Sequence, residues 1–472
     1  MNSNDISIDI VKFSKILFYS LICITLYGCD GLFGGEDELP SISDEEIKAG
    51  GATTIFQESS QAFANPAPNL DPEALEEHLA GDLNFEKNFV TAPAEINNGL
   101  GPLFVNTSCI SCHVRDGRGK PFFDDGEISA ALVRVSSNPN DNPGEPQPVD
   151  GFGLQIQNRS TFQAQSEARI DVQYETITET LADGTEVELR KPIYNLVDPY
   201  KPLPASVRTS VRTAPPVFGL GLLEAIPEKD ILESADPNDL DGDGISGKPN
   251  FVKDVQTGEK ALGRFGWKAN QPSLLQQSAA AYNEDMGVTS PVLPEENVHN
   301  NPQADDGLMD DPEISGQELR ETAFYVSTLG VPARRNTDDK TVRQGKKVFL
   351  EAGCDQCHTP RHETAVDFDI ESVRDQTIFP YTDLLLHDMG EGLADNRSDF
   401  EASGSEWRTA PLWGIGLTRV VNGHLSLLHD GRANGFLEAI LWHGGEAEQA
   451  KNFVKELNTN DREALIAFLK SL

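Results

Sequence analysis

Cys109-Ile110-Ser111-Cys112-His113 and Cys354-Asp355-Gln356-Cys357-His358 are two copies of one pattern, C-x-x-C-H. In this pattern the two thiols add across the vinyl groups of a haem, and the histidine that follows becomes an axial ligand of the iron. A zinc ribbon, a structural disulfide or a thioredoxin-like redox pair also uses paired cysteines, but a zinc site does not require the trailing histidine. The two motifs therefore predict two covalently bound c-type haems.

Length and composition limit what kind of protein this chain can be. Its 472 residues leave room for two or three domains, and the repeated motif favours two. The formal net charge of −38 argues against nucleic acid or an anionic membrane surface as a partner. A basic electron-donor protein or a small neutral oxidant fits this charge better. Four of the six cysteines lie in the haem motifs, so no disulfide framework is expected.

The N-terminus has the features of an export signal. Two lysines precede an apolar run, residues 16–26, which is too short to span a bilayer. Leu26-Tyr27-Gly28-Cys29 resembles a bacterial lipobox, in which cleavage leaves Cys29 as a lipidated N-terminus. We therefore expect residues 1–29 to be a lipoprotein signal peptide, and the body to be lipid-anchored on the periplasmic side of a bacterial membrane. An ordinary signal peptide, giving a soluble periplasmic protein, or an uncleaved anchor would also place the haem domains outside the cytoplasm.

The rest of the chain is predicted to be mainly α, with two tandem cytochrome c-like haem domains. Residues 30–86 are acidic and rich in Pro, Ser and Gly, which predicts a partly disordered tether. The N-terminal haem domain is expected over residues 87–330 and the C-terminal haem domain over residues 340–472. Residues 331–339, which include a proline, are predicted to link them.

An internal duplication supports this division. Residues 212–222 (RTAPPVFGLGL) match residues 408–417 (RTAPLWGIGL) with one residue deleted. Each copy closes with an amphipathic helix, predicted over Gln317–Leu329 and Asp461–Leu472 from apolar residues at i, i+3 and i+4.

The first copy is the longer one, and its insertions carry two features. One is a small β-hairpin, predicted over Arg169–Thr180 and Thr185–Pro192 with its turn at Asp183-Gly184. The other is an acidic loop, discussed next.

The acidic loop places Asp239, Asp241 and Asp243 at alternate positions, followed by Gly244. Oxygen ligands at this spacing, with a glycine at the sharp turn, are typical of an EF-hand-like calcium loop. Position 12 is Asn250 rather than Glu, so a bidentate ligand would have to come from elsewhere. The pattern predicts a calcium site, and a solvated acidic turn is the alternative.

Three further stretches make a family resemblance specific. They are residues 407–411 (WRTAP), 428–433 (LHDGRA) and 442–446 (WHGGE). Together with the haem motifs, they resemble the di-haem oxidoreductase family, a relative of the bacterial di-haem cytochrome c peroxidases, over about residues 90–472. The resemblance implies hydrogen peroxide as the oxidant and a small redox protein, a cytochrome or cupredoxin, as the electron donor.

The same resemblance suggests a distal ligand for the second haem. In the related peroxidases an axial methionine stands 14 residues after a histidine that corresponds to His429, and His443 occupies that position here. Ligation by two imidazoles should lower the reduction potential of that haem. His387 and Met389 form a rival pair of ligands, and a histidine on an ordinary helix face is the alternative for His443.

The first haem is expected to have an open or weakly ligated iron. No histidine occurs between His113 and His299, whereas the related peroxidases carry a displaceable one shortly after the motif. Their inter-haem tryptophan corresponds to Trp267, and their catalytic acid corresponds to Asp285 or Glu284. Breaking a peroxide O–O bond needs a proton, which a carboxyl in a low-dielectric pocket can hold near neutral pH. Solvated carboxylates and an ordinary buried tryptophan are the alternatives.

Taken together, the sequence predicts an exported peroxidase-like oxidoreductase. Electrons would pass from the C-terminal haem, by way of Trp267, to an open N-terminal haem that reduces hydrogen peroxide. Two other functions remain open. One is a non-catalytic electron-transfer cytochrome with Met286 on the first iron, and the other is an oxidase of a protein or organic substrate.

Overall fold

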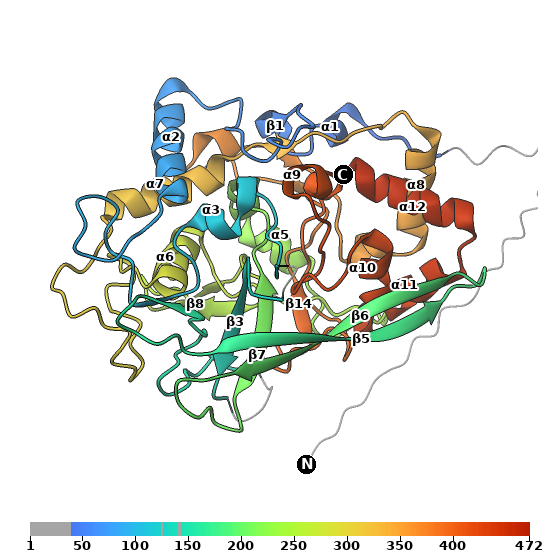
Figure 1. The fold of residues 1–472 in the computed structure, drawn as a ribbon. Helices are drawn as coiled ribbons and strands as arrows, with labels where there is room; N and C mark the ends of the chain where they lie inside the picture. The colour runs from blue at the N-terminus through green and yellow to red at the C-terminus, as the bar shows by residue number, and fades with distance from the viewer. Residues whose placement is uncertain (1–38, 124–125, 139–142) are drawn as a thin grey trace, which may run out of the picture. The chain divides into compact units, whose positions relative to one another are not determined.

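The structure is a computed structural model that describes residues 39–123, 126–138 and 143–472. In it, three helices pack around the first haem motif (Figure 1). They are α2 (Pro72–Glu86), α6 (Leu274–Met286) and α7 (Gly316–Thr328). Helices α2 and α7 come close at Gly81, where an added Cβ would lie 2.1 Å from the carbonyl oxygen of Glu321. The close crossing therefore requires glycine at this position.

Four helices form the corresponding part of the second half. They are α8 (Lys340–Glu351), α10 (Phe436–Trp442), α11 (Glu448–Glu456) and α12 (Thr459–Ser471). Helix α8 packs along α12, with Gly345 against the backbone of Ala464. The rings of Phe349, Tyr381 and Phe468 meet in the core beside this contact. The helices predicted at the end of each copy are thus confirmed as α7 and α12.

The remaining α-helices of the described residues are short. They are α1 (Asp44–Ile47), α3 (Cys109–Cys112), α4 (Leu220–Glu224), α5 (Glu228–Glu233) and α9 (Thr418–Asn422).

The described strands pair only two by two. The two longest pairs are antiparallel: β3 (Ala131–Ser136) with β7 (Arg208–Thr213), and β5 (Arg169–Thr180) with β6 (Glu186–Val197). The minor pairs are β1 (Thr54–Ile55) with β10 (Val331–Pro332), β2 (Leu103–Phe104) with β4 (Arg159–Ser160), β8 (Phe251–Lys253) with β9 (Lys260–Leu262), β11 (His362–Glu363) with β12 (Thr377–Ile378), and β13 (Leu386–Asp388) with β14 (Glu406–Arg408).

The β5–β6 hairpin confirms the predicted one and is longer than predicted. It reaches from the first half of the chain toward α11 and α12 (Figure 1). Near its tip, Asp183 accepts a hydrogen bond from Arg462 at 2.6 Å, and Lys455 donates to Glu179 at 2.6 Å. Leu181 and Leu189 are buried in the core of the second half. The insertion in the first copy therefore contacts the second half through ion pairs and buried leucines.

The prediction of a mainly α fold is confirmed only in part. Helices account for 29% of the structure, but small two-stranded sheets account for 18%, so the fold is mixed. The extra strands lie largely in the insertions of the first copy, where pairing with distant segments decides the structure. The division into two haem domains stays a prediction. One apolar core draws on both halves of the chain, because it contains Phe63 and Phe218 from the first half and Trp413 from the second.

The segment from Leu39 to Glu86, predicted to be a tether, packs on the body. Strand β1 pairs in parallel with β10, inside the predicted linker. Glu46 is buried, pairs with Arg334, and accepts hydrogen bonds from Lys346 Nζ and the Tyr381 hydroxyl, each at 2.6 Å. These charge pairs hold an acidic segment on the body, which composition alone did not reveal.

The predicted signal peptide and Cys29 lie outside the described residues. Within the described ranges, no helix has both the length and the apolar character needed to cross a membrane.

Candidate haem sites

A cavity of about 800 Å³ reaches both C-x-x-C-H motifs. Its wall is mostly apolar, as expected of a cofactor site. The predicted site residues that line it are Cys109, Cys112, His113, Trp267, Glu284, Asp285, Cys354, Cys357, His358 and His443. The structure thus brings together every predicted haem-site residue.

The two motifs share one local conformation. The backbone N–H of His113 donates to the Cys109 carbonyl at 3.0 Å, and that of His358 donates to the Cys354 carbonyl at 2.9 Å. One helical turn of this kind brings the histidine back toward the first cysteine of its motif. All four cysteine thiols are free and partly buried.

Both motif histidines have the protonation state that a metal ligand needs. His113 Nδ1 lies 2.7 Å from the Pro215 carbonyl oxygen, and His358 Nδ1 lies 3.0 Å from the Tyr381 carbonyl oxygen. A carbonyl only accepts, so each Nδ1 carries the hydrogen and each Nε2 keeps its lone pair. Burial lowers the pKa of each histidine to about 4, which keeps it neutral. Cysteines, neutral imidazoles and apolar walls therefore fit a haem at each motif.

A second imidazole lies close to His358. His443 stands at the end of α10, and its Nδ1 donates to the Ala439 carbonyl at 2.7 Å, so its Nε2 also keeps a lone pair. Burial first, and then the proximity of His443, lowers the pKa of His358, and both histidines line the same cavity. This arrangement supports His443 as the distal ligand of the second haem.

The rival histidine, His387, is engaged on both sides. Its Nε2 lies 2.8 Å from Asp383 Oδ2, and its Nδ1 lies 2.7 Å from Glu446 Oε2. Burial alone would lower the pKa of His387, but the hydrogen bonds to Asp383, Cys357 and Glu446 raise it to about 12. A doubly protonated imidazole has no lone pair for iron. Met389 lines the cavity and remains a candidate ligand.

The carboxyl of Asp285 lies beside the first motif. It accepts a hydrogen bond from Gln155 Nε2 at 2.7 Å, and burial raises its pKa to about 6. Its charge is the second cause, after burial, of the raised pKa of both the Cys109 and Cys112 thiols. Asp285 can therefore hold a proton next to the first haem site near neutral pH.

Glu284, the other predicted acid, has a different partner. Both of its carboxylate oxygens accept hydrogen bonds from the guanidinium of Arg134 on β3, one of them at 3.1 Å. A two-point ion pair of this kind fixes Glu284 as an acceptor. Of the two predicted acids, the structure favours Asp285.

Trp267 lies where the two halves of the chain meet. Its indole Nε1 donates to the Thr213 carbonyl at 2.8 Å, and its own carbonyl accepts from the Arg408 N–H at 2.9 Å. The Arg118 guanidinium lies 5.1 Å from its ring centroid. The indole also lines the cavity between the two motifs.

The family model for "Di-haem oxidoreductase, putative peroxidase" matches residues 44–472. The chain belongs to this family. The family name implies two haems, in agreement with the two motifs and the shared cavity of this di-haem oxidoreductase. No curated protein matches the chain.

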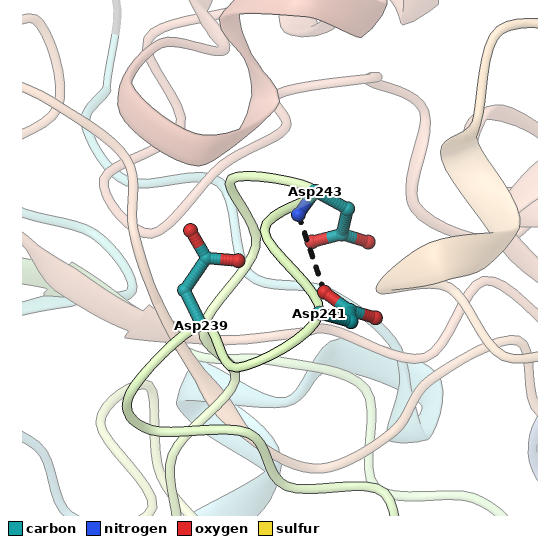
Figure 2. Close-up of side chains that lie close together, drawn as sticks. All are labelled: Asp239, Asp241 and Asp243. Carbon is teal, nitrogen blue, oxygen red and sulfur yellow. Dashed lines mark hydrogen bonds between the residues drawn. The ribbon is translucent and has the colours of Figure 1, made fainter.

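The acidic loop of the di-haem oxidoreductase brings its three aspartates together (Figure 2). Carboxylate oxygens of Asp239, Asp241 and Asp243 lie within 4.8 Å of one another and are exposed. Asn250, at position 12, is buried, and its amide nitrogen donates to backbone carbonyls elsewhere. Gln356, within the second haem motif, donates to Asp243 Oδ2 at 3.0 Å. The loop therefore adjoins the second haem motif.

Several site residues were missed from the sequence. Gln155 and Arg134 hold the two carboxylates of α6, and Arg118 covers the Trp267 ring. Gln155 lies 130 positions before Asp285, and Arg134 lies 150 positions before Glu284. No local spacing signals such pairs, because the chain brings them together only through tertiary packing.

Proposed function

We propose that this di-haem oxidoreductase is an exported peroxidase-like enzyme that reduces hydrogen peroxide at the first haem motif. Electrons enter at the second motif from a small, basic redox protein, a cytochrome or cupredoxin. The observation that carries the proposal is an asymmetry within one cavity. An imidazole, His443, lies near the second motif, whereas a buried carboxyl, Asp285, lies near the first.

The proton for peroxide cleavage comes from Asp285. A haem attached covalently through Cys109 and Cys112, with His113 as a ligand of its iron, would supply the redox chemistry at this site. Asp285 has a raised pKa and a hydrogen bond from Gln155 that orients its carboxyl. It delivers its proton to the leaving oxygen of peroxide, and its buried position limits exchange with water.

The second motif serves electron transfer. His358 and His443 would hold the second haem from its two sides, and an iron with two strong ligands has no place for a small oxidant. Trp267 relays electrons from this half to the first, because its indole lines the cavity and its backbone bonds to Arg408. The net charge of −38 favours a basic donor.

Location and metal content form a further part of the proposal. Covalent haem is attached outside the cytoplasm, which agrees with an exported protein on the periplasmic side of a membrane, anchored through Cys29. The spacing of Asp239, Asp241 and Asp243 supports a calcium ion in the acidic loop.

A simple electron carrier is the second candidate. Met286 is buried, ends α6 and lines the same cavity, so its sulfur is available to the first iron. A closed first site would leave no room for peroxide.

Two measurements on the purified protein, with its haems attached, test the proposal. Its ferric spectrum should contain one high-spin and one low-spin haem, and it should consume hydrogen peroxide while it oxidises a reduced small cytochrome. A wholly low-spin spectrum without peroxide consumption would establish the carrier instead.

A further inference from the structure

Tyr325 is a buried tyrosine that the proposed function does not use. It lies on α7 and is 3% exposed. Its hydroxyl donates a hydrogen bond of 2.8 Å to Oδ1 of Asp116, which is also buried. Asp116 lies three residues after His113, in the segment that follows the first haem motif. The pair therefore joins α7 to the segment that carries the motif.

A short chain of aromatic rings connects Tyr325 with the motif histidine. The Tyr325 ring centroid lies 5.2 Å from that of Phe85, and the Phe85 centroid lies 6.1 Å from that of His113. Phe85 is buried as well. The three rings thus form an unbroken line of contacts, buried at its outer end, that leads to the ring expected to bind the first iron.

Besides Asp116, the carboxyl of Asp82 lies near the tyrosine hydroxyl: burial first, and then Asp116 and Asp82, raise the pKa of Tyr325. The neighbouring ring of His78 is neutral. The His78 ring lies 4.8 Å from the Tyr325 ring. Its Nδ1 is 2.7 Å from Thr328 Oγ1, and that hydroxyl donates to the Phe324 carbonyl, so it accepts from His78. Burial lowers the pKa of His78 to about 4. No positive charge on His78 opposes removal of an electron from the phenol at neutral pH.

Oxidation of a buried tyrosine needs a partner for its proton. A phenol that loses one electron becomes strongly acidic, and the charge it would otherwise carry is costly inside a protein. The carboxylate oxygen of Asp116 is already in hydrogen-bond contact with the phenol. Proton and electron can therefore leave together without any movement of the fold.

We propose that Tyr325 is a one-electron donor to the first haem site, with Asp116 as its proton acceptor. This inference rests on the proposed function, because peroxide is the oxidant. Reduction of hydrogen peroxide to two waters takes two electrons and two protons. Tyr325 supplies one electron through Phe85, its O–H bond breaks, and its proton passes to Asp116. The second electron comes from the second motif. Of the two protons, one comes from Asp285 and the other from solvent, so that two waters form. The donor protein then returns an electron to the tyrosyl radical, and Asp116 returns the proton.

Rapid-freeze electron paramagnetic resonance tests this inference on the full protein with its haems attached. The protein is mixed with hydrogen peroxide without an external donor. We expect a radical signal whose hyperfine pattern changes when the protein contains ring-deuterated tyrosine. Tyr325→Phe keeps the ring and removes only the hydroxyl, so the tyrosyl signal should disappear.

Tyr282→Phe is the matched control. Tyr282 is buried in the same half, but its hydroxyl pairs with the Thr322 hydroxyl at 2.9 Å rather than with a carboxylate. This variant should keep the signal. Persistence of the signal in Tyr325→Phe, or its loss in Tyr282→Phe, overturns the assignment.

The isotope experiment on the unsubstituted protein does not depend on how the variants fold. If the protein consumes peroxide with a reduced donor but gives no tyrosine-sensitive signal, the tyrosine proposal fails and the proposed function stands. If it consumes no peroxide at all, the proposed function fails and the tyrosine proposal falls with it.

Discussion

The two haem motifs have similar hydrogen bonds at their cysteines and histidines, but different side chains lie near them. In each, the backbone N–H of the histidine donates to the backbone carbonyl of the first cysteine. The ring Nδ1 of the histidine donates to a backbone carbonyl from elsewhere in the chain. In each, a side-chain nitrogen also lies within hydrogen-bond distance of the sulfur of the second cysteine. Asn106 Nδ2 is 3.1 Å from Cys112 Sγ, and His387 Nδ1 is 3.5 Å from Cys357 Sγ. The two motifs thus have similar local geometry, although different segments of each copy supply the carbonyl and the side chain that contact them.

The difference lies in what else reaches each motif. Near the second motif, His443 supplies an imidazole with a free lone pair. Near the first, Asp285 supplies a buried carboxyl, which Gln155 from an insertion holds in place. The comparison teaches that two copies of one cytochrome motif acquire different roles through the segments packed against them.

Asp285→Asn should lower peroxide turnover by about 10²- to 10⁴-fold, the usual contribution of a general acid. Asparagine keeps the size of the side chain and accepts the hydrogen bond from Gln155, but it holds no acidic proton. The pKa of Asp285 is raised to about 6, so turnover by the unsubstituted enzyme should decline as the pH rises through about 6. That decline should be absent from the variant. Steady-state turnover from pH 5 to 8 measures both effects.

Glu284→Gln is the control for this prediction. Glu284 precedes Asp285 on the same helix, but its carboxylate is paired with Arg134. The variant should keep the pH-dependent decline. Full turnover in Asp285→Asn would show that Asp285 is not the proton donor. The two motifs would then not differ by an acid at the first and an imidazole at the second.

The sequence predicted those parts of this contrast that depend on local chemistry. The two motifs have fixed spacing, and the last helix of each copy has an apolar stripe that must be buried, so both could be identified. The β5–β6 hairpin followed from its Asp183-Gly184 turn.

The parts that the sequence did not predict depend on distant partners. Within the segment predicted to be a tether, Glu46 pairs with Arg334, a residue 288 positions later. The choice between Asp285 and Glu284 required the position of Arg134, and the exclusion of His387 required Glu446. Composition and periodicity carry no information about such pairs, so only the folded structure could decide them.

His443→Met should raise the reduction potential of the second haem. Replacing one of two imidazoles by a thioether favours the reduced iron, and we expect a rise on the order of 0.1 V, or about 2 kcal/mol for one electron. Spectroelectrochemical titration of the two haems measures the shift. The potential of the first haem should change little, because His443 lies beside the other motif.

His424→Met is the control for His443→Met. Both ring nitrogens of His424 have partners, since Nε2 donates to the Arg118 carbonyl and Nδ1 accepts from the Ser426 N–H. This variant should leave both potentials unchanged. An unchanged second potential in His443→Met would show that His443 is not a ligand.

His387→Gln tests whether His387 is charged. The folded protein raises the pKa of His387 to about 12, whereas an unfolded histidine has a pKa near 6.5. The stabilisation from this histidine is therefore complete below about pH 6.5 and declines as the pH rises toward 12. Urea unfolding should show a stability difference between the unsubstituted protein and the variant that shrinks by at most about 1.4 kcal/mol per pH unit above pH 6.5.

His362→Gln provides the comparison for that slope. His362 is also buried in the second half, but its Nε2 pairs with the Thr382 carbonyl, and burial lowers its pKa. Above pH 6.5 both its folded and unfolded forms are neutral, so the stability difference for this variant should not change with pH. A flat difference for His387→Gln would mean that His387 is neutral in the folded protein. A neutral His387 could bind the second iron in place of His443, and the proposed ligand of the second haem would then be wrong.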